Sequence, residues 1–149
     1  MRQEYVLCFV PFLDAKAFYH SHILLIEKEK PEWQKGKLNL PGGKLESGET
    51  PEGAAFRELW EETSLQAIDC KIMGKLTGAT YVVHVVTCYV GSRDYPVQRE
   101  TEKPLKLWID DALSRPNLIS NLKLVIPLCL AGVKGWEIED KHNYYRVSL

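Results

Sequence analysis

A glycine-led loop followed by an acid-rich helical pattern constrains this chain more than any other feature. Residues 42–65 read GGKLESGETPEGAAFRELWEETSL. Thr50 is a favoured N-cap residue, and Pro51 suits the first helical position because no intrahelical partner exists there for an N–H. Glu52 in the first turn is favourable beside the positive end of the helix dipole. The segment therefore predicts a loop that leads into a helix over Pro51–Thr63.

The predicted helix gathers carboxylates on one side. Glu58, Glu61 and Glu62 lie three and four residues apart, so they share a face. Another side carries Ala55, Phe56, Leu59 and Thr63. Each like-charged pair would cost roughly 0.2–0.5 kcal/mol on an exposed helix. One interpretation is a solvated acidic face, and the other is a site for Mg²⁺ or Mn²⁺, since these hard cations prefer oxygen ligands.

The spacing of these residues resembles the motif of a known family. From Gly43 it runs G-x5-E-x7-R-E-L-x-E-E-x-S-L. The Nudix box is G-x5-E-x7-R-E-U-x-E-E-x-G-U, with U a bulky aliphatic residue, and only Ser64 departs from it. The resemblance implies a hydrolase that uses a divalent metal to cleave nucleoside diphosphates linked to another group. It also implies an α/β Nudix fold, an α/β/α sandwich with a mixed sheet and a loop–helix–loop catalytic motif.

The resemblance also assigns roles within the box. The metal ligands would be the carbonyl of Gly42 and the carboxylates of Glu58, Glu61 and Glu62, and one carboxylate would also polarise the attacking water. Metal ions would offset the charge of the polyphosphate and lower the pKa of bound water.

Four further residues complete the box. Arg57 and Glu49 would form a supporting pair that holds the loop against the helix. Gly43 and Lys44 are assigned to substrate binding, because glycine lets the backbone approach a phosphate closely. The family glycine at position 64 would end the helix with a positive φ, which costs a serine on the order of 1 kcal/mol.

Residues outside the box bear on the substrate. The run 35–44, KGKLNLPGGK, is similar to MutT-type nucleoside triphosphatases. Asn39 stands where some relatives read a purine with an amide, which offers both a donor and an acceptor. Lys28 stands where relatives carry a basic residue facing the nucleotide. Glu102, or less well Glu100, resembles an extra catalytic acid on a loop, although a solvated loop charge is the plainer interpretation of either.

The favoured substrate is therefore a nucleoside triphosphate, with oxidised purines among the candidates, cleaved to a monophosphate and pyrophosphate. Tyr81 keeps a second hypothesis open, because a tyrosine at about this distance after the box marks dinucleoside polyphosphate hydrolases, although tyrosine is also common in strands. A third hypothesis is a nucleotide-sensing module without catalysis. Such modules typically lose box carboxylates, which this chain keeps.

Length and charge set the remaining expectations. The 149 residues suit a single domain, residues 1–149. A net charge of −1 predicts no attraction to a nucleic acid polymer or membrane. The resemblance to the Nudix family implies a small-molecule nucleotide as the partner, and a homodimer is left open. Neither a transmembrane run nor a signal-peptide pattern occurs, which favours a cytoplasmic protein. The four cysteines lack metal-ligand spacing and are expected to be reduced thiols.

Hydrophobic patterns predict strands interleaved with two or three helices. Strands are expected over Tyr5–Phe12, His22–Glu29, Leu38–Leu40, Gln66–Leu76, Thr80–Val90, Leu105–Ile109 and Trp136–Val147. A loop is expected through Asp14–Tyr19. Besides the box helix, a short helix is expected at Asp110–Leu113 and a longer one over Leu118–Val133. Pro127 would either kink that longer helix or mark its start.

Overall fold

The computed structural model describes residues 2–14 and 19–149, which form two sheets and three α-helices. The larger sheet is mixed, with the strand order β10-β9-β6-β7-β1-β5. Its strands are β1 (Gln3–Phe9), β5 (Gly42–Lys44), β6 (Asp69–Thr77), β7 (Tyr81–Tyr89), β9 (Trp136–Asp140) and β10 (Tyr145–Ser148). The smaller sheet holds β2 (Pro11–Asp14), β3 (Tyr19–Glu27), β4 (Leu38–Asn39) and β8 (Lys103–Trp108).

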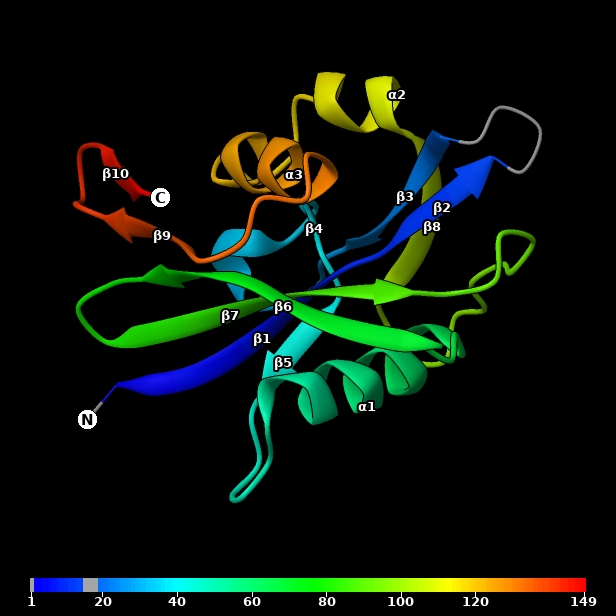
Figure 1. Ribbon diagram of the computed structural model, residues 1–149, viewed down its shortest axis with the longest axis horizontal. Coiled ribbons are helices and arrows are strands. Elements are labelled where there is room, and N and C mark those ends of the chain that lie inside the picture. The colour runs from blue at the N-terminus through cyan, green and yellow to red at the C-terminus, as the bar shows by residue number, and fades with distance from the viewer. Residues whose placement is uncertain (1, 15–18) are drawn as a thin grey trace.

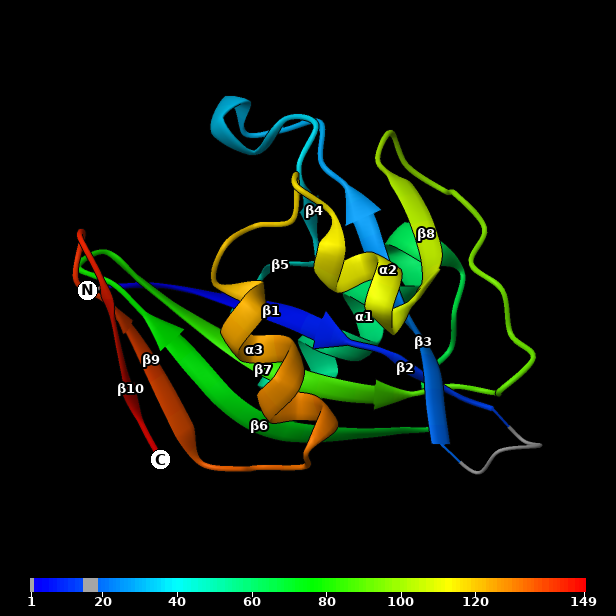
Figure 2. The same cartoon turned by 90° about the horizontal axis from the view of Figure 1, so that it is seen from above.

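Helices cover both faces of the strand layer. Figure 1 shows α1 (Pro51–Thr63) on one side, and α2 (Ile109–Ser114) and α3 (Leu122–Leu130) on the other. A core cluster that includes Val6, Leu24 and Leu59 lies under α1, and a larger one that includes Leu25 and Ile126 lies under α3. In Figure 2, α2 and α3 are seen from above, over the strands. This arrangement confirms the predicted α/β/α sandwich with a mixed sheet.

Helix α1 has the bounds that its capping residues predict. The hydroxyl of Thr50 accepts a hydrogen bond from the N–H of Gly53 (3.1 Å), and Ser64 ends the helix with φ 62°, as expected for the family glycine position. The buried stripe of α1 consists of Ala54, Ala55, Leu59, Glu62 and Thr63. Phe56 does not share it and is 41% exposed. Glu62, by contrast, turns inward with the stripe.

Some predicted elements are divided in the structure. The run Tyr5–Phe12 is not one strand, because the chain leaves the larger sheet after Phe9 and enters the smaller one at Pro11. The C-terminal run is a hairpin of β9 and β10 whose turn includes His142 at φ 73°. Helix α3 begins at Leu122, with Pro127 inside it, so the proline does not mark its start.

The remaining expectations concern the ends of elements and the cysteines. The expected loop at 14–19 lies mostly outside the described residues. All four cysteines are free thiols, and Cys8, Cys88 and Cys129 are buried. None of the helices in the described ranges is long and apolar enough to cross a membrane.

Candidate active site

The glycine loop is pressed between β1 and helix α1. Strand β5 pairs antiparallel with β1, where Gly42 lies opposite Leu7 and Gly43 opposite Val6. A Cβ atom on Gly42 would overlap the carbonyl of Val6, and one on Gly43 would overlap the carboxylate of Glu58. Only glycine therefore allows this carboxylate to lie directly on the loop backbone. The structure thus brings the two glycines and Glu58 together, as the box pattern predicts.

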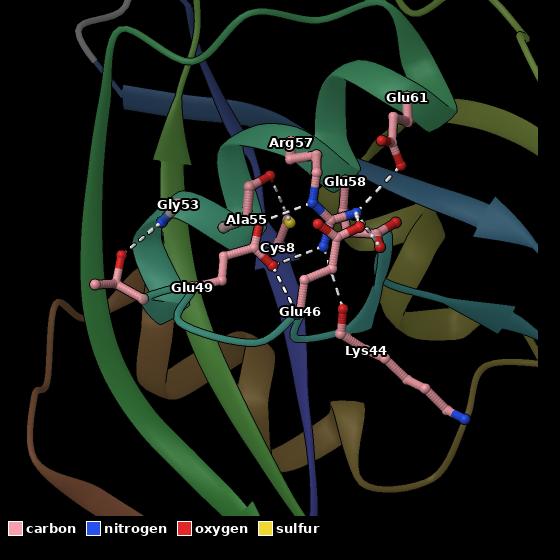
Figure 3. A network of polar contacts seen from close by, with 10 residues as sticks. Cys8, Lys44, Glu46, Glu49, Gly53, Ala55, Arg57, Glu58 and Glu61 are labelled. Atoms are coloured by element: carbon pink, nitrogen blue, oxygen red, sulfur yellow. Dashed lines mark hydrogen bonds and ion pairs between the residues drawn. The ribbon is translucent and has the colours of Figure 1, made fainter.

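Arg57 is the centre of a charged network that joins loop and helix (Figure 3). Its guanidinium donates to both oxygens of Glu49 (Nε to Oε2, 2.7 Å; Nη2 to Oε1, 2.8 Å), a bidentate geometry. It also donates to Glu58 Oε1 (2.9 Å), Glu61 Oε2 (3.2 Å) and the carbonyl of Lys44 (3.2 Å). The predicted pair of Arg57 and Glu49 is thus in contact. The ammonium of Lys44 points away from the network in Figure 3.

This pairing predicts a pH-dependent contribution to stability. Hydrogen bonds from Arg57 lower the pKa of Glu49 from 4.5 to about 2. Because the folded-state pKa lies below the unfolded one, the stabilisation is present above pH 4.5 and disappears as the pH falls toward 2. We expect Glu49→Gln to lower the free energy of unfolding by about 1–3 kcal/mol at pH 7.

Urea unfolding at a series of pH values measures this difference. The gap between wild type and Glu49→Gln should close as the pH falls below 4.5. Glu52→Gln is the matched control, because Glu52 is exposed in the first turn of the same helix. A gap that stays constant down to pH 2.5 would contradict the assignment of this stabilisation to the Glu49 carboxylate.

The three box carboxylates are not equivalent in the structure. Glu62 is buried, at 7% exposure, and burial, followed by the charge of Glu58, raises its pKa to about 9. Burial also raises the pKa of Glu58, although Arg57 opposes this shift. Glu61 has a 45% exposed side chain and turns to Arg57. Glu58 and Glu62 therefore form a desolvated inner pair, with Glu61 outside it.

One oxygen of this inner pair has no partner. Glu62 Oε2 is buried without a hydrogen bond, which is costly for a carboxyl oxygen. A cation would supply the missing partner, so the residues present fit a divalent metal. In the present side-chain conformations, residues 2–14 and 19–149 contain no group of three His, Cys, Asp or Glu side chains that could hold a metal ion. Arg57 engages Glu58 and Glu61, so these two carboxylates would have to turn from it to become ligands.

Two residues predicted separately meet beside the inner pair. Lys28 Nζ lies 3.1 Å from Glu102 Oε1, and the N–H of Glu29 donates to Glu102 Oε2 (2.8 Å). Both side chains are largely buried, because only 16% of the Lys28 side chain and 11% of the Glu102 side chain is exposed. Glu102 and Glu100 are also close enough to Glu62 to help raise its pKa, while Lys28 opposes this. The acid on the loop and the basic residue thus stand together at the edge of the carboxylate cluster.

The two residues predicted to contact the base lie in different places. Asn39 is half-buried on β4, where its Nδ2 donates to Gln34 Oε1 (3.2 Å) and its Oδ1 accepts from the N–H of Leu40 (2.8 Å). Gln34 belongs to a short 3-10 helix, Glu32–Gln34, that the sequence patterns did not single out. Tyr81 instead follows the turn between β6 and β7, at the opposite end of the larger sheet from the C-terminal end of α1 (Figure 1). Its hydroxyl donates to Asp140 Oδ2 (3.2 Å).

Comparison with known proteins agrees with this geometry. The fold and the glycine loop before an acid-rich helix define an α/β protein with a Nudix-type loop–helix site. The NUDIX domain profile matches residues 1–117, and the chain belongs to this family. Its structure superposes on a crystal structure of the mutator MutT protein from Bacillus halodurans with a TM-score of 0.73, at 20% identity, covering 98% of this chain and 97% of that one.

Curated relatives match over shorter segments. The chain is 32% identical over 101 residues to an ADP-sugar pyrophosphatase from Mus musculus, covering 64% of this chain and 45% of that protein. It is 35% identical over 54 residues to an 8-oxo-dGTP diphosphatase from Proteus vulgaris, covering 36% of this chain and 48% of that protein. The chain thus spans less than half the length of either relative.

Proposed function

We propose that this NUDIX protein is a metal-dependent hydrolase of phosphoric anhydride bonds. The preferred substrate is a nucleoside triphosphate, which yields a monophosphate and pyrophosphate. The observation that carries the proposal is the desolvated pair of Glu58 and Glu62, held over a glycine loop with one carboxyl oxygen lacking a partner. A protein keeps such a costly arrangement where a ligand completes it, and perturbed carboxyl groups of this kind gather at functional sites.

The metal in this proposal is Mg²⁺ or Mn²⁺. Glu58, Glu61 and Glu62 would hold it, with the Gly42 carbonyl and, from the opposing loop, Glu102. When bound, such an ion offsets the negative charge of a polyphosphate and makes water easier to deprotonate. All the donors are oxygen atoms, which agrees with the preference of these hard cations.

Other residues of the chain would accept a proton, orient the carboxylates or contact the phosphates of the substrate. A carboxylate of the inner pair can accept a proton from the attacking water only when it is ionised. A cation bound beside Glu58 and Glu62 would favour that ionised form, because it opposes the rise in pKa that burial causes in both residues. Arg57 orients the helix carboxylates and fixes the loop through Glu49 and the carbonyl of Lys44. Lys28 supplies positive charge for a phosphate beside this cluster. The backbone of Gly43 lies at the same place, directly under Glu58.

Asn39 and Gln34 favour a purine nucleotide among the candidates. Their amides bond to each other, and each amide can offer both a donor and an acceptor to a base edge. The relative from Proteus vulgaris is named for a purine triphosphate, 8-oxo-dGTP. A dinucleoside polyphosphate is less favoured, because Tyr81 bonds to Asp140 away from the carboxylates. An ADP-sugar is the second candidate, since the relative from Mus musculus is named for it.

Hydrolysis of a nucleotide panel with Mg²⁺, followed by identification of the products, tests the proposal. The panel contains purine and pyrimidine triphosphates, 8-oxo-dGTP, ADP-ribose and a diadenosine polyphosphate. We expect the highest kcat/KM with a purine triphosphate and release of pyrophosphate. If the protein binds a nucleotide tightly but hydrolyses no compound of the panel, the hypothesis of a nucleotide-sensing module would take the place of the proposed enzyme.

Asn39→Ala is expected to lower kcat/KM for the preferred purine triphosphate by roughly 5–150-fold, equivalent to about 1–3 kcal/mol, with a smaller effect on pyrimidines. The reason is that a base edge would lose a buried hydrogen-bonding partner. Asn143→Ala is the matched control, because Asn143 is exposed in the β9–β10 turn. An unchanged ratio of purine to pyrimidine kcat/KM in Asn39→Ala would remove the purine assignment.

A further inference from the structure

The loop between β7 and β8, residues 90–102, crosses the C-terminal end of helix α1 (Figure 1). The N–H of Val97 donates to the carbonyl of Thr63 (2.8 Å), which is one of the last carbonyls of the helix. Such terminal carbonyls have no partner within the helix, so a loop that donates to them is anchored there. The loop is thereby tied to the same helix that carries the inner carboxylate pair.

Arg99 makes the second anchor of this loop. Its Nη1 donates to the carbonyl of Trp60 (3.2 Å), and its guanidinium lies 4.8 Å from the centroid of the Trp60 ring. A cation beside the C-terminal end of a helix and over an aromatic face is favourable on both counts. Trp60 occupies the unspecified position within the acidic run of the box, so the box pattern assigns it no role. It is 45% exposed, which leaves the ring free to receive the arginine.

The residues that follow Arg99 return to the carboxylate cluster. The charges of Glu100 and Glu102 both act on the carboxyl group of Glu62. Glu102 is then fixed by Lys28 and the N–H of Glu29. Arg99 is therefore the last residue of the loop in contact with α1 before the chain reaches Glu100 and Glu102, whose charges act on Glu62. These like charges repel one another, and the contact of Arg99 with Trp60 opposes a movement of this part of the loop away from the helix.

We propose that Arg99 is a positioning residue, whose clamp on Trp60 holds Glu100 and Glu102 beside Glu62 so that loop and helix together bind the cation. The proposal rests on the proposed function, because it concerns the same metal site. It assigns a role to an arginine–tryptophan pair that lies outside the supporting pair of Arg57 and Glu49. It also explains why an exposed tryptophan stands in the middle of an acidic helix turn.

The test compares Arg99→Ala with Arg93→Ala, an exposed arginine of the same loop. Mn²⁺ binding is measured by titration calorimetry without nucleotide, and amide hydrogen exchange is followed at Val97 in the metal-free protein. We expect Arg99→Ala to weaken Mn²⁺ binding roughly 10-fold or more, by the scale of residues that orient metal ligands. Exchange at Val97 should become faster, while Arg93→Ala should match wild type in both measurements.

Arg99→Lys separates positioning from a general loss of fold. Lysine keeps a cation near the Trp60 ring but lacks the planar guanidinium with its several N–H donors. The Mn²⁺ affinity of Arg99→Lys should therefore lie between that of wild type and that of Arg99→Ala. Trp60→Phe should likewise be milder than Trp60→Ala. The melting temperature of each metal-free variant is recorded, and agreement with wild type shows that the loop and not the fold has changed.

Unchanged Mn²⁺ affinity and unchanged exchange at Val97 in Arg99→Ala would overturn the proposal, whatever happens to activity. Lost activity with wild-type Mn²⁺ affinity would overturn it as well, because Arg99 would then act elsewhere. If wild type hydrolyses no nucleotide but Arg99→Ala still loses Mn²⁺ affinity, the positioning role stands and the proposed function fails. The two failures are therefore distinguishable.

Discussion

Glu62→Gln is expected to lower kcat by at least about 100-fold, the scale of losing a metal ligand or a general base. Glutamine keeps the size of the side chain but removes a carboxylate from the buried inner pair. The metal-free variant should be at least as stable as wild type at neutral pH, because burial, followed by the charge of Glu58, raises the pKa of Glu62 in the folded state and so makes this carboxyl group destabilising above its unfolded pKa. A loss of activity without a loss of stability would mark Glu62 as functional.

Steady-state kinetics and thermal unfolding of the metal-free protein measure these two effects. Glu52→Gln is the matched control, because it makes the same chemical change at an exposed position of the same helix. Its kcat should stay within about twofold of wild type, since exposed surface changes rarely matter. If Glu62→Gln kept wild-type kcat, the inner pair could not be the site of the chemistry.

The features of this site that the sequence predicts are those determined by neighbouring residues. The start of α1 follows from Thr50 and Pro51, and its end follows from the glycine-like position of Ser64, which takes φ 62°. The contact of Arg57 with Glu49 is the one that the resemblance to the Nudix box implies, and the structure has it as a hydrogen bond of 2.7 Å. Such local signals act over one or two helical turns, so tertiary packing changes them little.

The features that sequence patterns missed depend on tertiary contacts. Helical spacing places Glu62 with Glu58 and Glu61, but not inside the protein, because burial depends on the sheet beneath and the loop above. Phe56 is exposed and Glu62 is buried, the reverse of what their polarity predicts. The proposed metal site would account for the inward carboxylate. The contacts of Gln34 with Asn39 and of Lys28 with Glu102 join separate segments. A single sequence carries no signal for such pairs.

Trp60 is a second residue whose contact depends on tertiary structure. The box spacing assigns it no role, and a residue that is 45% exposed on a helix gives no sign of a specific partner. Its partner Arg99 lies 39 residues further along the chain. Only the path of the loop between β7 and β8 brings the two together, and that path depends on how the two sheets are joined.

Removal of divalent metal is expected to abolish activity, and Mg²⁺ or Mn²⁺ should restore it. Burial, followed by the charges of Glu58, Glu100 and Glu102, raises the pKa of Glu62, so negative charge from both the helix and the loop acts on this carboxyl group. A cation bound there would stabilise only the folded state, by about 2.7 kcal/mol at a concentration 100 times its Kd. For a chain of this size we expect the melting temperature to rise by roughly 5–10 °C.

Differential scanning calorimetry after EDTA treatment, with and without added Mg²⁺, measures this shift, and a NaCl control at equal ionic strength separates binding from screening. Glu62→Gln should show a smaller rise, since it lacks one donor. Full activity after stringent chelation would exclude the metal-dependent reaction, and a metal-induced rise that is equal in wild type and Glu62→Gln would place the cation away from the inner pair.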